Sequence, residues 1–449
     1  MACSLVGTGP PSSTSTDVLD PLPIEPVDGP LDATVTLPGS KSITNRALVC
    51  AALADGQSTL TRVLDADDTV AMAEGLRTLG VEVVATGPAE LTIVGTAERR
   101  AGAVDARQSG TTARFLLPLL ALGEGMSTLD GDPQLRERPM GPTFDALRSA
   151  GVRVEEQAGE GRLPVTIAGP LRASALEVPG DVSSQFLTGL LLIGPATPDG
   201  LELTITTELI SRPYVDMTVA VMRAFGAAVD HDEVGGREAW HVSPERYRAT
   251  TYDIEPDASA ASYAWAAALV TGGRITVPGL HRGSLQGDVA FAEVLEQMGA
   301  EVTWHDDAIT VAAGDVLRGV DVDMAHISDT VPTLAAIAAL ADGPTTIRGV
   351  GFIRDKESDR IAGPVAELQR CGVDAEATDD GMVIRPRPLR PATFETYRDH
   401  RMAMAFGLLG LTGPGMAVRD PGCVAKTFPG FWALLDDLRA GTVPPARHG

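Results

Sequence analysis

Basic side chains recur at the points where polar loops run into very apolar segments. Lys41 and Arg46 open "SKSITNRALVCAALADG", and Arg114 and Arg401 lie in two later segments of the same kind. A cation about 4 Å from an anion in a partly shielded site contributes ~4 kcal/mol at an effective dielectric of about 20. Further cations stand in loops before amphipathic segments: Arg138, Lys356, Arg360 and Lys426. Considered together, these residues predict a site for multiply charged anions, because Arg binds phosphate and carboxylate groups bidentately.

Two acids accompany the cations. Asp329 begins an apolar segment, and Glu357 is flanked by Lys356 and Arg360. The pair would suit general base and general acid, with one carboxyl ionised and the other protonated. A helix N-cap for Asp329 and a surface ion pair for Glu357 explain the two acids equally well, and an N-cap alone explains Asp257.

Neutral hydrogen-bonding residues lie in two further motifs. "VSSQF" and "ISRPYVDM" supply donors suited to a phosphorylated polyol: Ser183, Ser184, Gln185, Ser211 and Tyr214. A lone Arg on an apolar helix is more often paired to a neighbouring carboxylate than to a ligand, and this interpretation competes with a binding role for Arg114. The charged and neutral motifs must be brought together by the elements that carry them.

Those elements form a sixfold repeat. Each repeat contains two helices. One is amphipathic and ends in Gly, which suits the C′ position. In the first five repeats it is followed by a run of alternating polar and apolar residues, which is typical of a strand. The closing glycines are Gly80, Gly151, Gly226, Gly299, Gly372 and Gly441. The other member is a helix that is apolar all round, as a buried helix is, and that opens with an N-cap residue. The expected N-caps are Ser40, Ser109, Ser183, Asp257, Ser328 and Asp399.

The sequence therefore predicts six α/β units of about 72 residues, three in each of two domains. The join falls near residues 250–256. If the buried helices run parallel, their N-termini meet on one face and favour anions through free N–H groups and helix dipoles.

Charge and cysteine content narrow the class of protein. The formal net charge of −24 weighs against nucleic acid or anionic membrane as a partner. Apolar runs are shorter than the ~20 residues that span a bilayer. No two cysteines are close in sequence, so neither a disulfide framework nor a zinc site is expected. We expect a cytoplasmic monomer whose residues 1–30, without a targeting pattern, form a disordered tail.

Nine motifs together resemble one known family. They occur in order over residues 31–441: "PGSKSITNRAL", "SGTTARFL", "RERPMGP", "SSQFLTGLL", "SRPYVDMT", "SDTVPTLA", "DKESDRI", "DHRMAM" and "AKTFPGF". The chain is similar to the 5-enolpyruvylshikimate-3-phosphate synthases. The resemblance implies a two-domain inside-out α/β barrel, with three βαβαββ-like repeats and buried parallel helices in each domain and the substrates between them. It assigns residues 40–253 to one domain and residues 31–39 with 254–441 to the other, leaving 442–449 as a tail.

The resemblance also implies a reaction. The enolpyruvyl group of phosphoenolpyruvate passes to the 5-hydroxyl of shikimate 3-phosphate, phosphate is released, and no metal or organic cofactor takes part. Carried over by motif, Asp329 is the base, Glu357 the proton donor and Lys41 a lysine that touches both substrates. Shikimate 3-phosphate would be bound by Lys41, Ser42, Arg46, Ser183, Ser184, Gln185, Ser211, Tyr214, Asp329 and Lys356. Phosphoenolpyruvate would be bound by Lys41, Gly110, Thr111, Arg138, Gln185, Arg360, Arg401 and Lys426.

The departures from the family pattern are local. Gln108 and Phe115 stand where the family commonly has Asn and Pro, on either side of Gly110 and Thr111. Since the family is typically inhibited by glyphosate at the phosphoenolpyruvate site, these two positions bear on inhibitor potency more than on catalysis.

Two other functions remain as alternatives. The UDP-N-acetylglucosamine enolpyruvyl transferases share the fold but typically carry a reactive Cys in a loop that corresponds to residues 129–142, where this chain has none. A non-catalytic phosphometabolite-binding protein would gain nothing from Glu357, whose charge would repel its ligand.

Overall fold

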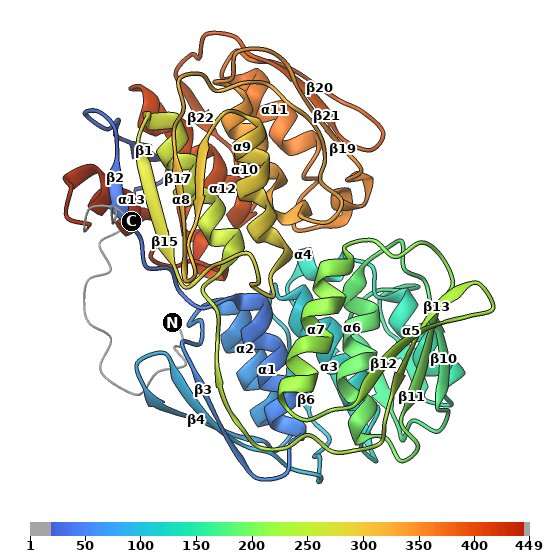
Figure 1. The fold of residues 1–449 in the computed structure, drawn as a ribbon. Helices are drawn as coiled ribbons and strands as arrows, with labels where there is room; N and C mark the ends of the chain where they lie inside the picture. The colour runs from blue at the N-terminus through green and yellow to red at the C-terminus, as the bar shows by residue number, and fades with distance from the viewer. Residues whose placement is uncertain (1–18, 444–449) are drawn as a thin grey trace. The chain divides into compact units, whose positions relative to one another are not determined.

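The computed structural model describes residues 19–443, which form two compact units (Figure 1). Unit 1 comprises residues 39–255, and unit 2 comprises residues 19–38 together with 256–443. The chain thus leaves unit 2 after Pro38 and returns to it at Pro256. The α/β fold class predicted from the repeats is confirmed.

Five four-stranded sheets share one pairing pattern. Counted in spatial order, the first strand of each sheet pairs parallel with the second, and the third lies antiparallel between the second and the fourth. Unit 1 holds three of them, written in spatial order: β14 (Thr251–Asp253), β3 (Gln57–Thr61), β5 (Glu90–Val94), β4 (Glu82–Gly87); β6 (Ala103–Asp105), β7 (Met126–Asp130), β9 (Val165–Ala168), β8 (Arg153–Glu156); β10 (Ala175–Val178), β11 (Leu201–Ile205), β13 (Arg237–Val242), β12 (Val229–Val234).

Unit 2 holds the other two four-stranded sheets and a sixth, smaller one. In spatial order they are β2 (Asp32–Thr34), β15 (Arg274–Pro278), β17 (Ala308–Ala312), β16 (Glu301–Trp304); β18 (Asp321–Asp323), β19 (Thr345–Arg348), β21 (Met382–Arg385), β20 (Asp374–Ala377); and β22 (Ala392–Phe394), β23 (Met416–Val418), β1 (Leu22–Ile24). The first sheet of each unit takes its first strand from the segment next to a crossing point, β14 in unit 1 and β2 in unit 2.

The sixth sheet corrects the prediction of a disordered tail over residues 1–30. Residues Leu22–Ile24 form β1, which pairs antiparallel with β23. Ile24 is buried, and the Val27 N–H donates to the carbonyl of Leu411 at 3.2 Å. Among residues 19–443 no strand follows the helix Phe431–Ala440 that closes the sixth repeat, and β1 is the antiparallel strand of this sheet. Residues 1–18 and 444–449, which make up most of the two expected tails, lie outside the described part of the chain.

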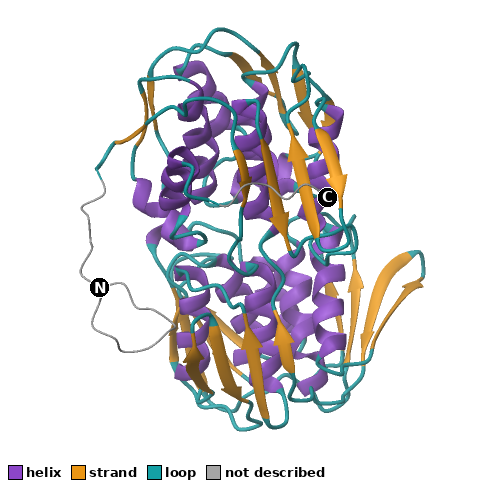
Figure 2. Ribbon diagram, turned by 60° about the vertical axis from the view of Figure 1, so that its left-hand side comes forward, coloured by secondary structure: helices purple, strands orange, loops and turns teal. Residues whose placement is uncertain are grey.

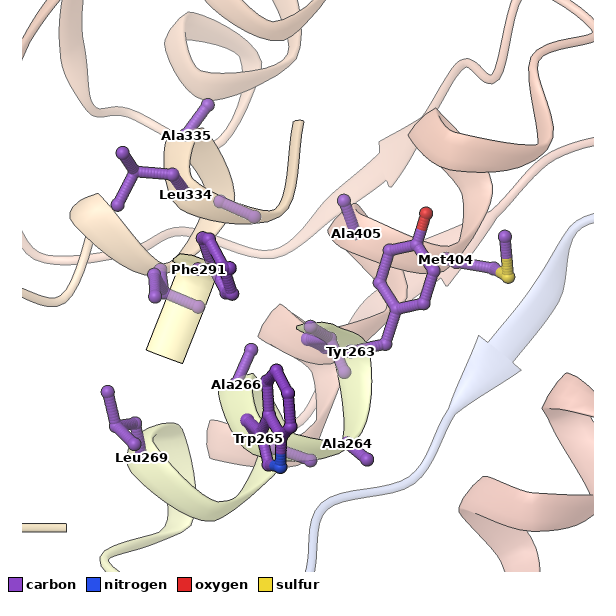
Figure 3. Packing of buried hydrophobic residues seen from close by; sticks show 14 of the residues in the cluster. Tyr263, Ala264, Trp265, Ala266, Leu269, Phe291, Leu334, Ala335, Met404 and Ala405 are labelled. Atoms are coloured by element: carbon purple, nitrogen blue, oxygen red, sulfur yellow. The ribbon is translucent and has the colours of Figure 1, made fainter. Parts of the chain in front are cut away.

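The helices alternate along the chain as predicted, and in each unit they pack against the sheets (Figure 2). The buried set comprises α1 (Lys41–Leu53), α3 (Gly110–Leu120), α6 (Ser184–Ile193), α8 (Ala258–Thr271), α10 (Val331–Ala338) and α12 (His400–Gly407). The amphipathic set comprises α2 (Asp67–Thr78), α5 (Gly141–Ser149), α7 (Arg212–Ala224), α9 (Phe291–Gln297), α11 (Ala362–Arg370) and α13 (Phe431–Ala440). Side chains of α8, α10 and α12 meet in the core of unit 2 (Figure 3).

Five of the six expected N-caps are confirmed, because the side chains of Ser40, Ser109, Ser183, Asp257 and Asp399 each accept a backbone N–H bond. The prediction for Ser328 is wrong. A 3₁₀ turn over Ser328–Thr330 precedes α10, and the N–H groups of Thr330 and Val331 donate to the carbonyls of Ile327 and Ser328. The donors that a Ser328 side chain would have capped are therefore already bonded.

The six closing glycines all have positive φ, between 65° and 100°, as the C′ position requires. In the five complete repeats an arginine from 18 to 22 residues later packs on that end of the helix. Its backbone N–H donates, at 2.7–3.1 Å, to the carbonyl of the residue before the glycine. The residues are Arg100, Arg172, Arg248, Arg318 and Arg390. A cation there complements the helix dipole, which the glycine pattern alone did not predict.

None of the helices formed by residues 19–443 combines the length and the apolar character that crossing a bilayer requires.

Candidate active site

In unit 1, the lysine that opens the first buried helix lies beside a buried acid. Lys41 is the first residue of α1, and its Nζ lies 3.5 Å from Oδ2 of Asp68 in α2. The Asp68 side chain is only 2% exposed. The carboxylate therefore fixes the amine at the N-terminal end of the helix, where Ser40 caps the first turn.

Arg46 connects two helices of unit 1. Its Nε donates to Oγ1 of Thr218 at 2.8 Å, and its terminal nitrogens donate to the carbonyls of Ser42 at 2.8 Å and Tyr214 at 3.0 Å. Phe115 lies under the guanidinium, 5.2 Å from the ring centre. Burial among neutral groups lowers the pKa of Arg46 to about 10. Three of the five N–H groups of a guanidinium are thus bonded to α1 and α7 themselves.

The N-termini of α3 and α6 meet through a chain of side-chain hydrogen bonds. Gln185 Nε2 donates to Oγ1 of Thr111 at 3.3 Å, and Gln185 Oε1 accepts from Arg114 at 2.8 Å. Arg114 also donates to the carbonyl of Pro139 at 3.0 Å and stacks on Phe186. Arg114 is therefore paired within the protein, and its acceptors include a side-chain amide and a backbone carbonyl.

Arg138 is held against a glycine. The guanidinium lies so close to Gly110 that a Cβ built there would be 2.4 Å from one terminal nitrogen and 2.7 Å from Cζ. Arg138 itself is 6% exposed. Gly110 is thus the residue that leaves room for the arginine at the N-terminus of α3.

The predicted serine and tyrosine donors of unit 1 lie at the starts of α6 and α7. Ser183 caps α6 and Ser184 is its first residue, both buried. Ser211 precedes α7 with φ of 53°, a left-handed conformation that costs a non-glycine residue energy. Tyr214 lies one turn later, and its backbone carbonyl accepts a hydrogen bond from Arg46.

In unit 2, one arginine holds three carboxylates. Arg360, 2% exposed, donates from Nε to Asp399 at 2.8 Å and from its terminal nitrogens to Asp329 at 3.2 Å, Glu357 at 2.7 Å and Asp399 at 3.1 Å. Burial opposes the charge, but the three carboxylates outweigh it and raise the pKa of Arg360 above its usual range.

Each of the two predicted catalytic acids also contacts a second cation. Asp329 Oδ2 lies 2.6 Å from a terminal nitrogen of Arg401, and Glu357 Oε1 lies 3.4 Å from Nζ of Lys426. Asp329 is in the 3₁₀ turn before α10 and does not cap that helix. Both acids are thus parts of one ion cluster, and the plain N-cap and surface-pair explanations do not describe them.

Lys356 and His400 lie next to residues of the ion cluster in the sequence. Lys356 stands at the end of the 3₁₀ turn Gly351–Asp355, with its Nζ 5.9 Å from the centre of the Phe352 ring. His400 is fully buried, and neither ring nitrogen makes a hydrogen bond to any of residues 19–443, although Nδ1 lies 3.6 Å from Oδ1 of Asp399. Burial, with the charges of Lys426 and Arg401, holds the pKa of His400 well below its usual range, so the ring is neutral at pH 7.

Sequence reasoning missed two carboxylates that hold the predicted cations. Asp399 was interpreted only as a helix cap; it does cap α12, but it also binds Arg360 and accepts from the Ser358 hydroxyl at 2.9 Å. Its position two residues before Arg401 was the available signal. Asp68 stands in the acidic run "DADD", where nothing in the sequence distinguishes it from its neighbours. Within residues 19–443, no group of three or more His, Cys, Asp or Glu is placed to hold a metal ion.

Comparison with known proteins identifies the family. A model of the EPSP synthase (3-phosphoshikimate 1-carboxyvinyltransferase) family matches residues 27–435. The chain belongs to this family. A 3-phosphoshikimate 1-carboxyvinyltransferase from Trichormus variabilis is 43% identical over 423 residues, which cover 92% of this chain and 98% of the relative. One from Methanoculleus marisnigri is 42% identical, covering 91% and 97%.

Solved structures agree with the sequence comparison. EPSP synthase from Acinetobacter baumannii has a TM-score of 0.77 at 26% identity, covering 94% of this chain and 98% of that one. The enolpyruvyl transferase NikO from Streptomyces tendae has a TM-score of 0.73 at 21% identity, covering 93% and 97%, and shows the shared fold alone. The predicted enzyme activity, that of a 3-phosphoshikimate 1-carboxyvinyltransferase, is confirmed. The UDP-sugar transferase alternative is not favoured.

Proposed function

We propose that the ion cluster of unit 2 and the site residues of unit 1 carry out the transfer of the enolpyruvyl group from phosphoenolpyruvate to the 5-hydroxyl of shikimate 3-phosphate. In the addition step, the methylene carbon of phosphoenolpyruvate gains a proton, and the 5-hydroxyl oxygen bonds to C2 as it loses its own. In the elimination step, the tetrahedral adduct loses phosphate and a proton from the new methyl group, which leaves the enol ether. The proton count closes without an oxidant or a reductant.

The observation that carries this proposal is the placement of two carboxylates among three cations in unit 2. Asp329 lies against Arg360 and Arg401, and Glu357 lies against Arg360 and Lys426. We assign Asp329 as the base for the 5-hydroxyl and Glu357 as the proton donor to the methylene carbon. The cations would hold the carboxylate and phosphate of phosphoenolpyruvate, whose oxygens would take over bonds that now go to protein acids.

The residues of unit 1 suit the binding of anions by preset donors. Lys41 would touch both substrates. The proposed shikimate 3-phosphate ligands include the caps and first residues of α1, α6 and α7, whose hydroxyls and free N–H groups suit a phosphate. They are Ser42, Arg46, Ser183, Ser184, Gln185, Ser211 and Tyr214, joined by Asp329 and Lys356 of unit 2. In unit 1, Gly110, Thr111, Arg138 and Gln185 would contact phosphoenolpyruvate.

We further infer that these metabolites are the protein's partners and that it acts as a cytoplasmic monomer. Its net charge of −24 weighs against binding to nucleic acid or an anionic membrane. Light scattering of the purified protein tests the monomer.

The test of the function is phosphate release on mixing the protein with both substrates. Release that depends on both shikimate 3-phosphate and phosphoenolpyruvate is the expected result. If shikimate 3-phosphate binds while release stays at background, the chain is a binding protein and the proposed catalysis is wrong.

A further inference from the structure

A buried carboxyl group lies behind the ion cluster of unit 2 and is absent from the proposed set of site residues. Asp288 is in the 3₁₀ turn η2 (Gly287–Ala290), which packs against α8, and the residue is 3% exposed. An ionised carboxyl group that is taken out of water is costly unless polar partners receive it. The position of those partners indicates what the group does.

The partners connect Asp288 to the cluster. Oδ2 of Asp288 accepts a hydrogen bond from the hydroxyl of Ser259, the second residue of α8. The Ser259 oxygen in turn lies 3.4 Å from a terminal nitrogen of Arg401, and the same nitrogen lies 2.6 Å from Oδ2 of Asp329. One guanidinium nitrogen is therefore held on one side by Asp329 and on the other by a serine that Asp288 orients.

Charge acts along the same path. Burial, followed by the charge of Asp329, raises the pKa of Asp288 to about 6. The Ser259 hydrogen bond and the charge of Arg401 act in the opposite direction, and Asp257 adds to the raising. Asp288 thus changes its charge in the range between pH 5 and pH 7.

We propose that Asp288, acting through Ser259, is a positioning residue that holds Arg401 in place to receive phosphoenolpyruvate. Ionised Asp288 accepts the Ser259 proton and so turns a lone pair of the serine oxygen toward Arg401. When Asp288 is protonated or replaced, Ser259 no longer holds this nitrogen of Arg401, whereas the contact of Arg401 with Asp329 remains. The proposal rests on the role of Arg401 in phosphoenolpyruvate binding given under Proposed function.

The first test is the KM for phosphoenolpyruvate in Asp288→Asn as a function of pH. We expect the ratio of the variant's KM to that of the wild type to be about three- to tenfold at pH 8, the size expected for one net hydrogen bond. The ratio approaches one at pH 5, where the wild-type carboxyl is itself protonated. Because both proteins see the same substrate ionisation, that ionisation cancels in the ratio. A ratio that is the same at pH 5 and pH 8 overturns the proposal.

The second test removes the connecting hydroxyl. Ser259→Ala raises KM at pH 8 by a similar factor, whereas Ser259→Thr, which keeps a hydroxyl, restores the wild-type value. The double variant Asp288→Asn, Ser259→Ala is no worse than either single one, because both act on the same link. Fully additive effects contradict the proposed path.

Glu367→Gln is the matched control, because Glu367 is also a buried acid and is bound to Arg370 and Tyr397. This variant should lower the melting temperature, while the ratio of its KM to that of the wild type stays independent of pH.

A third measurement does not depend on turnover. A carboxyl whose pKa is raised on folding takes up protons in the folded state, so wild-type stability falls relative to Asp288→Asn as pH rises from 4 to 7. A constant difference in melting temperature over that range overturns the buried titration on which the proposal depends.

Arg401→Lys distinguishes a wrong role for Arg401 from a wrong role for Asp288. If it leaves KM unchanged, the proposed role of Arg401 is wrong; if it raises KM while Asp288→Asn does not, only the role of Asp288 is wrong.

Discussion

The two units each bury an arginine at the candidate site, and the two arginines are held in opposite ways. Arg46 in unit 1 donates to a hydroxyl and two carbonyls, and burial lowers its pKa to about 10. Arg360 in unit 2 donates to three carboxylates, which raise its pKa. The three acceptors of Arg46 therefore leave its positive charge uncompensated, whereas the carboxylates around Arg360 neutralise its charge.

This difference suggests a division of work. Neutral partners fix a cation without cancelling its charge, which suits the capture of an anionic substrate. Carboxylates cancel the charge and are themselves able to exchange protons, which suits chemistry. Unit 1 would then mainly bind, and unit 2 would mainly move protons.

The largest effect should follow from removing a proton donor of unit 2. Glu357→Gln keeps the shape of the side chain but has no exchangeable acid proton, so kcat should fall by about 10²–10⁴-fold. Phosphate release under saturating substrates measures the loss. Glu376→Gln, an exposed acid paired with Arg385, is the matched control and should keep wild-type kcat. A kcat for Glu357→Gln within about twofold of the wild type removes Glu357 from the chemistry.

The comparison of the two arginines is tested by stability. Asp399→Ala removes the fully buried carboxylate that pairs with the buried Arg360. Breaking such an ion pair lowers the free energy of unfolding by about 3–5 kcal/mol. Thr218→Val removes only a neutral partner of Arg46 and should cost about 1–3 kcal/mol. Urea unfolding of both variants gives the two values. Equal losses would show that the partner's charge does not distinguish the two sites.

A smaller effect is expected from the contact between Gly110 and Arg138. Gly110→Ala places a methyl group where the guanidinium now lies, so Arg138 must move away from the start of α3. Loss of a charged hydrogen bond is worth about 1.5–3 kcal/mol, which corresponds to a rise in the KM for phosphoenolpyruvate of roughly 10- to 150-fold. Gly422→Ala, where a Cβ meets nothing within 4 Å, is the control. An unchanged KM in Gly110→Ala would show that Arg138 does not need its present position.

The repeats were predictable from sequence because they depend on local signals. Apolar periodicity located both helix families, and glycines such as Gly80 and Gly372 adopt the positive φ that their position after a helix indicated. The cap residues were predictable for the same reason. The wrong prediction of Ser328 as a helix cap also has a local cause. In the 3₁₀ turn the N–H groups of Thr330 and Val331 donate to backbone carbonyls, so they do not need the Ser328 side chain.

The partners of the site residues were not predictable, because packing sets them over long sequence separations. Arg360 and Asp399 are 39 residues apart, and Arg46 and Thr218 are 172 apart. The same holds for β1, whose three residues gain their role only by pairing with a strand near the other end of the chain. The positions of Arg360, Arg401 and Lys426 in the repeats indicated that these cations would gather, but not which acid would hold which cation.

The central claim is most directly tested by Asp329→Ala, assayed for phosphate release and for calorimetric binding of shikimate 3-phosphate in the same preparation. The account predicts that release falls to background while the affinity for shikimate 3-phosphate stays largely intact, because most of its proposed ligands belong to unit 1. Turnover equal to that of the wild type, or the loss of binding and turnover together, would contradict it.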